Sequence, residues 1–310
     1  MTGVVIATGP AAERRLGLIC GVAAYAIWGL FPIYIRELDP AGAVEVVAHR
    51  IAWSVPFGAA ILALRRQWPE TWAALKSPRI VALLGLSAFL ISINWLVYVW
   101  AVANDRVLQA SLGYYINPLL FIAAGVFVLK EKLSLLQGVA VALAGAGVLA
   151  LIVGAGVVPW PSFILAVSFT AYGFVRKTTP VGAMPGLFIE TLLLAPFALA
   201  TLAFLANSGA LQFGKHGAGL DALLIAAGPM TVGPLVLFAL AARRLSLTTV
   251  GFLQYIGPTG QFLLGVYYGE PFTTAHAICF GLIWSALALT SVDAVRRNRA
   301  PAKESLTKSV

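Results

Sequence analysis

Charged residues are scarce in this sequence. They make up 11% of the 310 residues, while hydrophobic residues make up 60%, and an ordinary soluble domain has roughly 25% charged residues. A soluble protein of this length could not hide so much apolar surface from water. The composition therefore excludes a soluble enzyme, a disordered chain and a nucleic-acid-binding protein. It predicts a polytopic membrane protein whose main surroundings are the lipid bilayer.

Cysteine and histidine are also rare. The two cysteines, Cys20 and Cys279, lie in separate apolar runs, and the three histidines are far apart in the sequence. Two cysteines without nearby histidines do not build a zinc site or a disulfide framework. We therefore expect no metal and no cofactor. The apolar stretch before residue 8 is too short for a signal peptide, so we expect no cleaved targeting segment.

Long apolar runs are what the sequence has instead. A membrane-spanning helix needs about 20 predominantly apolar residues, and ten segments approach that length. The fold class we predict is an all-α integral membrane protein with ten transmembrane helices and two polar tails, residues 1–15 and 294–310. The ten segments are Leu16–Ile35, Val44–Leu64, Ile80–Val102, Val107–Val128, Leu135–Gly154, Val158–Val175, Pro185–Leu205, Leu220–Leu240, Thr248–Tyr267 and Thr274–Val292.

The distribution of basic residues predicts the orientation in the membrane. With the N-terminus inside, most of the 21 Lys and Arg residues fall in the two tails and in alternate loops of the cytoplasmic side. Only Arg36, Arg106 and Lys215 fall on the opposite side. Cytoplasmic loops are enriched in Lys and Arg. We therefore expect a multi-pass protein of the inner membrane with both termini cytoplasmic.

The two halves of the chain resemble one another. At a shift of 140 residues YYINP at 114–118 aligns with QYIGP at 254–258, and Pro56 aligns with Pro196. These matches predict two five-helix repeats, residues 16–154 and 155–293. Because five is odd, the second repeat enters the bilayer from the opposite side, which is the inverted repeat of many secondary transporters.

Several segments make the sequence similar to the drug/metabolite transporter superfamily, and within it to the RarD branch of the EamA permeases. The resemblance covers the chain from Leu16 to about Arg297 and implies a ten-helix inverted repeat that carries small metabolites through a central cavity without nucleotide hydrolysis. It identifies no substrate. The segments are WGLFPIY (28–34), HRIAWS (49–54), INWLVYVWAV (93–102), LGYYINPL (112–119), KEKLS (130–134) and FLQYIGPT (252–259).

Two ionisable residues stand out inside the predicted spans. Arg50, next to His49, and Glu190 occupy equivalent positions at the shift of 140. Charges at membrane depth are costly and often functional, so all three are candidates for gating or coupling. Glu190 has no basic residue at helical spacing, which predicts an unpaired, structurally dispensable carboxylate that could carry a proton. Alternatively, Arg50 and Glu190 extend to the nearest membrane surface.

The substrate site is predicted around the matched prolines Pro118 and Pro258. Proline removes a backbone donor and kinks a helix, and irregular backbone at membrane depth often lines a cavity. The alternative is that these are packing kinks with interfacial aromatic residues. The candidate binding residues are Tyr114, Tyr115, Asn117, Gln254, Tyr255, Trp28, Trp95 and Tyr172.

These features favour a secondary transporter of a small metabolite or drug-like molecule that works by alternating access, as a monomer or weak dimer, with proton coupling as one option. A channel, a receptor or a membrane-embedded enzyme is the alternative. The sequence contains no HExxH, GxSxG or Walker A motif and no paired intramembrane aspartates. An enzyme is therefore not expected.

Overall fold

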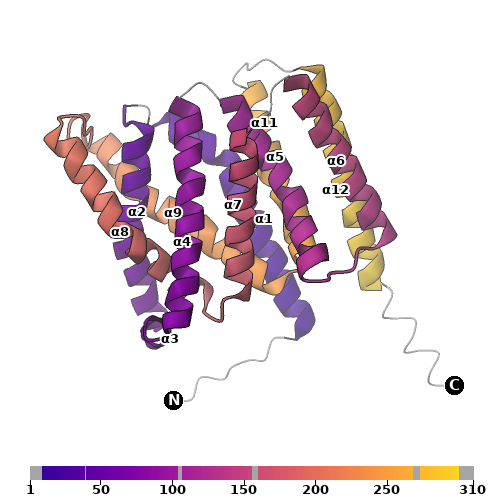
Figure 1. Ribbon diagram of the computed structural model, residues 1–310, viewed down its shortest axis with the longest axis horizontal. Helices are drawn as coiled ribbons and strands as arrows, with labels where there is room; N and C mark the ends of the chain where they lie inside the picture. The colour runs from indigo at the N-terminus through magenta and orange to yellow at the C-terminus, as the bar shows by residue number, and fades with distance from the viewer. Residues whose placement is uncertain (1–8, 39, 104–106, 156–159, 268–272, 300–310) are drawn as a thin grey trace.

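The computed structural model describes residues 9–38, 40–103, 107–155, 160–267 and 273–299. All regular structure in these ranges is helical (Figure 1). The elements are α1 (Pro10–Arg36), α2 (Ala43–Leu64), α3 (Trp68–Leu75), α4 (Pro78–Ala103), α5 (Val107–Ala123), the π-helical turn η1 (Ala124–Val128), α6 (Leu135–Ala155), α7 (Trp160–Thr178), α8 (Ala183–Asn207), α9 (Ala218–Arg244), α10 (Leu247–Gln254), α11 (Ile256–Tyr267) and α12 (Thr274–Arg299).

The chain is an all-α multi-pass membrane protein. Within the described residues, seven helices are long and apolar enough to cross a bilayer, namely α1, α2, α4, α6, α8, α9 and α12. Their outer faces carry large exposed apolar side chains: Leu64 is 85% exposed, Val153 78% and Phe197 72%. Such an apolar surface suits lipid and would be costly in water.

The other three predicted spans are helical but depart from a single long apolar helix. The fourth is α5 followed by η1, and the sixth, α7, ends in the polar residues Arg176, Lys177 and Thr178. The ninth is split into α10 and α11 at Tyr255. The split comes three residues before Pro258, which has no N–H to donate to the carbonyl of Gln254. Pro118, by contrast, lies inside α5, and the irregular turn follows only at Ala124.

Two more boundaries differ from the sequence-based expectation. The segment after α2, expected to be loop, contains the short helix α3, which packs on α8. The segment RKTTP at 176–180, also expected to be loop, is helical up to Thr178, so α7 carries Arg176 back into the protein, where the side chain is 1% exposed.

Helices that are distant in sequence pack side by side. The pair α6 and α12 forms one end of the molecule, at the right of Figure 1. Elsewhere α1 packs on α9 and α11, α2 on α8 and α9, and α7 on α4 and α5. The α1–α11 contact is close because Gly29 and Gly260 face each other: a Cβ on Gly29 would lie 3.3 Å from the Cα of Gly260. Only glycine allows so close a backbone approach.

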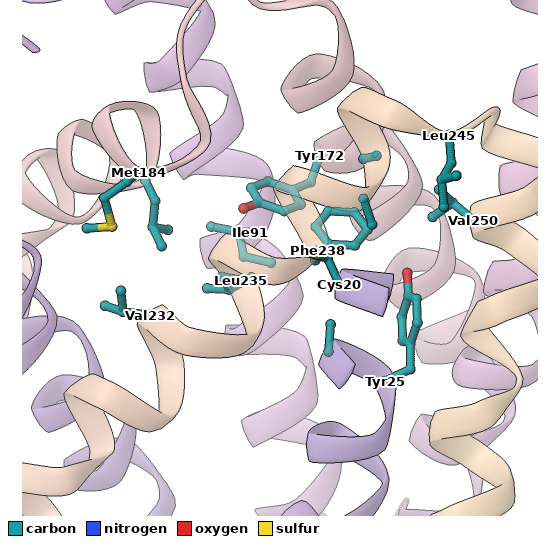
Figure 2. Packing of buried hydrophobic residues seen from close by; sticks show 14 of the residues in the cluster. Cys20, Tyr25, Ile91, Tyr172, Met184, Val232, Leu235, Phe238, Leu245 and Val250 are labelled. Atoms are coloured by element: carbon teal, nitrogen blue, oxygen red, sulfur yellow. The ribbon is translucent and has the colours of Figure 1, made fainter. Parts of the chain in front are cut away.

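The buried side chains form two main clusters. The larger, here the central cluster, joins α1, α4, α7, α8 and α9 around Phe238 and Tyr172, which stack with ring centroids 6.0 Å apart (Figure 2). The second, here the α12-side cluster, joins α5, α6, α10 and α12. The two clusters place different predicted site residues in different surroundings.

Candidate functional site

Arg50 projects from α2 into the helix bundle. Its Nε donates a 3.0 Å hydrogen bond to Oγ1 of Thr231 on α9. The guanidinium also lies over two aromatic rings, 5.2 Å from the centroid of Phe31 on α1 and 5.0 Å from that of Trp95 on α4. The predicted candidate Trp95 is therefore beside Arg50, and the candidate Tyr114 on α5 packs against Tyr98 on α4 with ring centroids 6.2 Å apart. The Arg50 side chain is thus held by residues of α1, α4 and α9.

His49, the neighbour of Arg50, is buried and belongs to a different contact set. Its Nδ1 accepts a 3.1 Å hydrogen bond from Trp53 Nε1, and its Nε2 lies 3.8 Å from Glu45. Glu45 accepts hydrogen bonds from the backbone N–H groups of Gln212 and Phe213. His49 and Glu45 therefore hold the loop between α8 and α9 against the start of α2.

Glu190 on α8 is buried and paired. Its Oε1 lies 3.5 Å from Nη1 of Arg176, and both side chains are at most 2% exposed. Oε1 also accepts a 2.6 Å hydrogen bond from the hydroxyl of Ser87 on α4, and the Tyr172 hydroxyl lies beside the same carboxylate. The prediction of an unpaired Glu190 is therefore wrong. Its partner is on α7, a relationship that spacing along α8 could not reveal.

Trp28 and Tyr172 converge on the same two rings. Trp28 lies 5.9 Å from Phe169 and 6.1 Å from Phe238, while Tyr172 lies 5.8 Å and 6.0 Å from these rings. The structure therefore brings together these two candidate residues, Trp28 of α1 and Tyr172 of α7. Trp28 is only partly buried, whereas Tyr172 is buried.

Asn117 and Gln254 also meet, across the contact between α5 and α10. Asn117 Nδ2 donates to Gln254 Oε1 at 2.6 Å, and its Oδ1 accepts from the Thr170 hydroxyl on α7 at 2.9 Å. The helices approach closely here because Gly251 lies against the backbone carbonyl of Pro118. Two buried polar atoms nearby, Gln254 Nε2 and the Tyr25 hydroxyl, have no hydrogen-bond partner in the described structure.

Tyr115 and Tyr255 lie apart from these groups. Both are buried in the α12-side cluster, and Tyr115 packs edge-on against Phe280 at 5.6 Å. They do not share the surroundings of Trp28, Tyr172 or Arg50. These two side chains pack toward α12, while their neighbours Asn117 and Gln254 occupy the face between α5 and α10.

No group of three or more potential metal ligands of the His, Cys, Asp and Glu types occurs among the described residues. The polar groups that do converge are a guanidinium, amides, hydroxyls and one ion pair. They can bind and orient a small molecule.

Comparisons with known proteins identify the family. The chain matches the EamA-like transporter family over residues 15–153. It is 45% identical to Protein RarD of Streptomyces exfoliatus over 93% of this chain and 91% of that protein. It is 44% identical to an uncharacterised transporter of Pseudomonas aeruginosa over 93% of this chain and 97% of that protein. The chain belongs to the EamA-like transporter family.

A crystal structure shares the fold of this EamA-family chain with a TM-score of 0.65, at 19% identity, over 89% of this chain and 97% of that one. The family and its relatives are transporters. The protein is therefore a membrane transporter and not an enzyme.

Three residues of this EamA-family chain escaped the sequence analysis. The sequence predicts Arg176 in a loop, and it does not single out Ser87 and Thr231, because hydroxyl side chains are common in membrane helices. Ser87 and Thr231 bond to residues on helices far away in sequence, and Arg176 pairs with Glu190 on the next helix. The candidate Tyr172 lies one helical turn before Arg176 on the same face of α7, and this spacing could have indicated Arg176 as a site residue.

Proposed function

We propose that the protein is a secondary carrier that moves a small organic molecule across the inner membrane by alternating access. The carrier has ten spans in two inverted repeats, residues 16–154 and 155–293, with both ends in the cytoplasm. The spans are α1, α2, α4, α5 with η1, and α6 in the first repeat, and α7, α8, α9, α10 with α11, and α12 in the second. The single chain is the transport unit.

The packing of the helices supports the repeat. Exchanging each span for its proposed equivalent turns the contact of α1 with α9 into that of α7 with α4, and both pairs pack closely. The same exchange converts the contact of α5 with α7 into that of α11 with α1. It also converts the contact of α2 with α9 into that of α8 with α4, and all four pairs are packed. The pairs α2–α8, α5–α10 and α6–α12 convert into themselves. This exchange symmetry is the observation that carries the proposal, because an inverted repeat requires it.

Individual contacts follow the same exchange. Arg50 on α2 bonds to a hydroxyl on α9, Thr231, and its equivalent Glu190 on α8 accepts from a hydroxyl on α4, Ser87. The matched stretch of the EamA-like family, residues 15–153, has nearly the bounds of the first proposed repeat.

The orientation of the ends agrees with the charge pattern. The start of α1, the helix α3 and the end of α12 lie at the same lower edge of the molecule in Figure 1. An even number of crossings brings both ends to one side. The basic loops then make that side the cytoplasm.

The contact between α7 and α9 breaks the exchange symmetry, and this break supports alternating access. Within the described residues α7 packs on α9, whereas the equivalent helices α1 and α4 are not in close contact. In agreement, Glu190 is buried while Arg50 is only partly buried. A carrier closed on the Glu190 side and more open on the Arg50 side has this asymmetry. Its other state would interchange the two arrangements.

Glu190 is the residue that we propose for proton coupling. The groups around its carboxylate are Arg176 and Tyr172 on α7 and Ser87 on α4. Protonation of Glu190 would leave the Arg176 guanidinium as an uncompensated buried charge, which is costly. Movement of the Arg176 side chain toward water at the cytoplasmic end of α7 then lowers the free energy, because water solvates the unpaired charge. Proton binding and opening of this side are thereby linked.

Counterflow in proteoliposomes tests the carrier proposal. Vesicles preloaded with a candidate metabolite should take up the labelled compound faster than empty vesicles, with saturation, because a carrier returns faster when loaded. Flux that rises linearly with concentration and ignores internal substrate would indicate a channel. The topology is tested by reporter fusions, which should read inside after Arg66 and Lys132 and outside near Lys215.

A further inference from the structure

We infer that the transported substrate is a small organic acid and that the guanidinium of Arg50 binds its carboxylate. This inference rests on the proposed carrier function and names its substrate class. It starts from a contrast between the two arginines within the helix bundle, of which one has an acidic partner and the other does not.

The Arg50 side chain is fixed within the bundle by three helices. Nε donates its hydrogen bond to the Thr231 hydroxyl. The ring centroids of Phe31 and Trp95 lie 5.2 Å and 5.0 Å from the guanidinium carbon. The hydrogen bond through Nε leaves the outer edge of the guanidinium, with its two Nη atoms, available. That edge is the part of arginine that binds a carboxylate with two parallel hydrogen bonds.

Arg50 has no acidic partner in the described part of the chain. No carboxylate oxygen lies within 4 Å of it there. The nearest acidic residue in sequence is Glu45, whose two oxygens accept from backbone N–H groups of the loop between α8 and α9. Asp221 likewise accepts from the N–H of Gly214.

Arg176 shows what the fold does with a charge that serves the structure. It is paired with Glu190 at 3.5 Å and donates through Nη2 to the carbonyl of Ala183 at 2.8 Å. An intramembrane cation without such a counter-charge is costly and is usually functional. Aromatic faces offset part of this cost, but they supply no negative charge. An anionic ligand supplies it.

The residues around the free edge indicate the rest of the ligand. Phe31 and Trp95 present apolar faces to the guanidinium, and the rings of Tyr98 on α4 and Tyr114 on α5 lie 6.2 Å apart. Aromatic walls with a few hydroxyl groups and one cation suit a molecule with a compact apolar body and one acidic group. Arg50 itself is only partly exposed.

The test compares acids with their own neutral amides. Purified full-length protein in non-ionic detergent is titrated with benzoate and benzamide, phenylacetate and phenylacetamide, and indole-3-acetate and its amide. Binding is read from tryptophan fluorescence, for which Trp95 is a local reporter, and from thermal shift. We expect at least one acid to bind about ten- to hundredfold more tightly than its amide, the range for a hydrogen-bonded charge.

Variants then locate the site. Arg50→Gln should remove the preference for the acid over its amide. Arg65→Gln, an exposed arginine just after α2, is the matched control and should keep the preference. If Arg50→Gln fails to fold, Arg50→Lys retains the charge without the two-pronged edge, and it should reduce the preference several-fold without abolishing it.

The inference fails if no acid in the panel is preferred over its amide, or if Arg50→Gln or Arg50→Lys retains the full preference. It also fails as a substrate site if added phosphatidylglycerol competes with the acid at Arg50, because the anion would then be a lipid headgroup. Counterflow in phosphatidylcholine vesicles separates this result from the carrier proposal. Counterflow of neutral compounds without acid preference would contradict the acid substrate and leave the carrier proposal standing. Acid binding at Arg50 without counterflow of any probe would contradict the carrier proposal and leave Arg50 as a binding site for an acid.

Discussion

The guanidinium of Arg176 and the carboxylate of Glu190 face each other 3.5 Å apart with both side chains buried. Gly186 makes the pair possible, because a Cβ at that position would overlap the guanidinium. Nη1 and Nε of Arg176 and Oε2 of Glu190 have no hydrogen-bond partner in the described structure. The pair is thus a Coulombic contact in a low-dielectric site with incomplete hydrogen bonding, an arrangement suited to being broken and remade.

The first prediction concerns the stability of this pair. Arg176→Gln should lower the free energy of unfolding by about 3–5 kcal/mol, because it leaves a buried carboxylate without a counter-charge. Thermal and denaturant unfolding in detergent measures it. The double variant Arg176→Gln with Glu190→Gln should recover much of the loss, since neither charge remains.

A surface pair provides the control. Glu13 and Arg244 lie 2.8 Å apart with 42% and 23% of their side chains exposed. Glu13→Gln should therefore change the stability by about 1 kcal/mol at most. Equal losses in the two single variants would contradict the structural importance of the buried pair.

The second prediction concerns coupling. The double variant Arg176→Gln with Glu190→Gln should still exchange substrate in counterflow, but its net uptake should no longer respond to an imposed proton gradient. The reason is that the variant has no carboxylate there to protonate. Net flux with and without a pH difference measures this. A variant that responds like the wild type would show that protons act elsewhere or not at all.

The third prediction separates packing from binding at Tyr255. Its ring is fully buried in the α12-side cluster and its hydroxyl has no hydrogen-bond partner in the described structure. Tyr255→Phe should therefore leave the melting temperature unchanged or raise it. Tyr255→Ala should cost about 3–5 kcal/mol, as expected for removing a buried aromatic ring.

Affinity per folded molecule decides between the two roles. We expect both variants at Tyr255, and the same pair at Tyr115, to bind substrate with nearly wild-type affinity. A several-fold weaker affinity in a stable Tyr255→Phe or Tyr115→Phe variant would show that the hydroxyl takes part in substrate binding.

The fourth prediction concerns Glu131, which caps a helix of the other half. Its carboxylate accepts from the N–H groups of Leu247 and Thr248 at 2.7 Å and 2.9 Å, and from the Thr248 hydroxyl at 2.7 Å. Glu131→Gln should cost about 1–2 kcal/mol, because it removes a negative charge at the N-terminus of α10. Faster amide exchange at residues 247–250 would report the loss. Glu131→Asp, with its shorter reach, should be intermediate; unchanged exchange in both variants would show that the cap adds nothing.

Much of the architecture was predictable because the bilayer constrains it. Each of the ten predicted segments coincides with a helix or with two consecutive helical pieces, since long apolar runs leave few other options. The division of the ninth segment at Tyr255 was less predictable. Pro258 predicts an interrupted helix, but Pro118 lies in a similar motif and α5 continues through it. Tertiary packing decides how each proline is accommodated.

The partners of the charged residues were the least predictable part. The sequence ranks Arg50 and Glu190 as equivalent, yet the fold gives Glu190 an arginine and gives Arg50 two aromatic rings. These contacts join residues more than ten positions apart on different helices, and no spacing rule within a helix reaches that far. The side-chain direction of Tyr115 and Tyr255 depended likewise on which neighbouring helix occupied the opposite face.

The packing of each half mainly on the other has a consequence for biosynthesis. Helices of residues 16–154 find most of their neighbours in the second half, and Arg50 and Glu131 find their bonding partners there. While the ribosome is still translating the second half, the spans of the first half must therefore remain in the bilayer as loosely associated segments. A fragment ending at Gly154 should be degraded when made alone and rescued when residues 155–310 are produced from a second gene in the same cell.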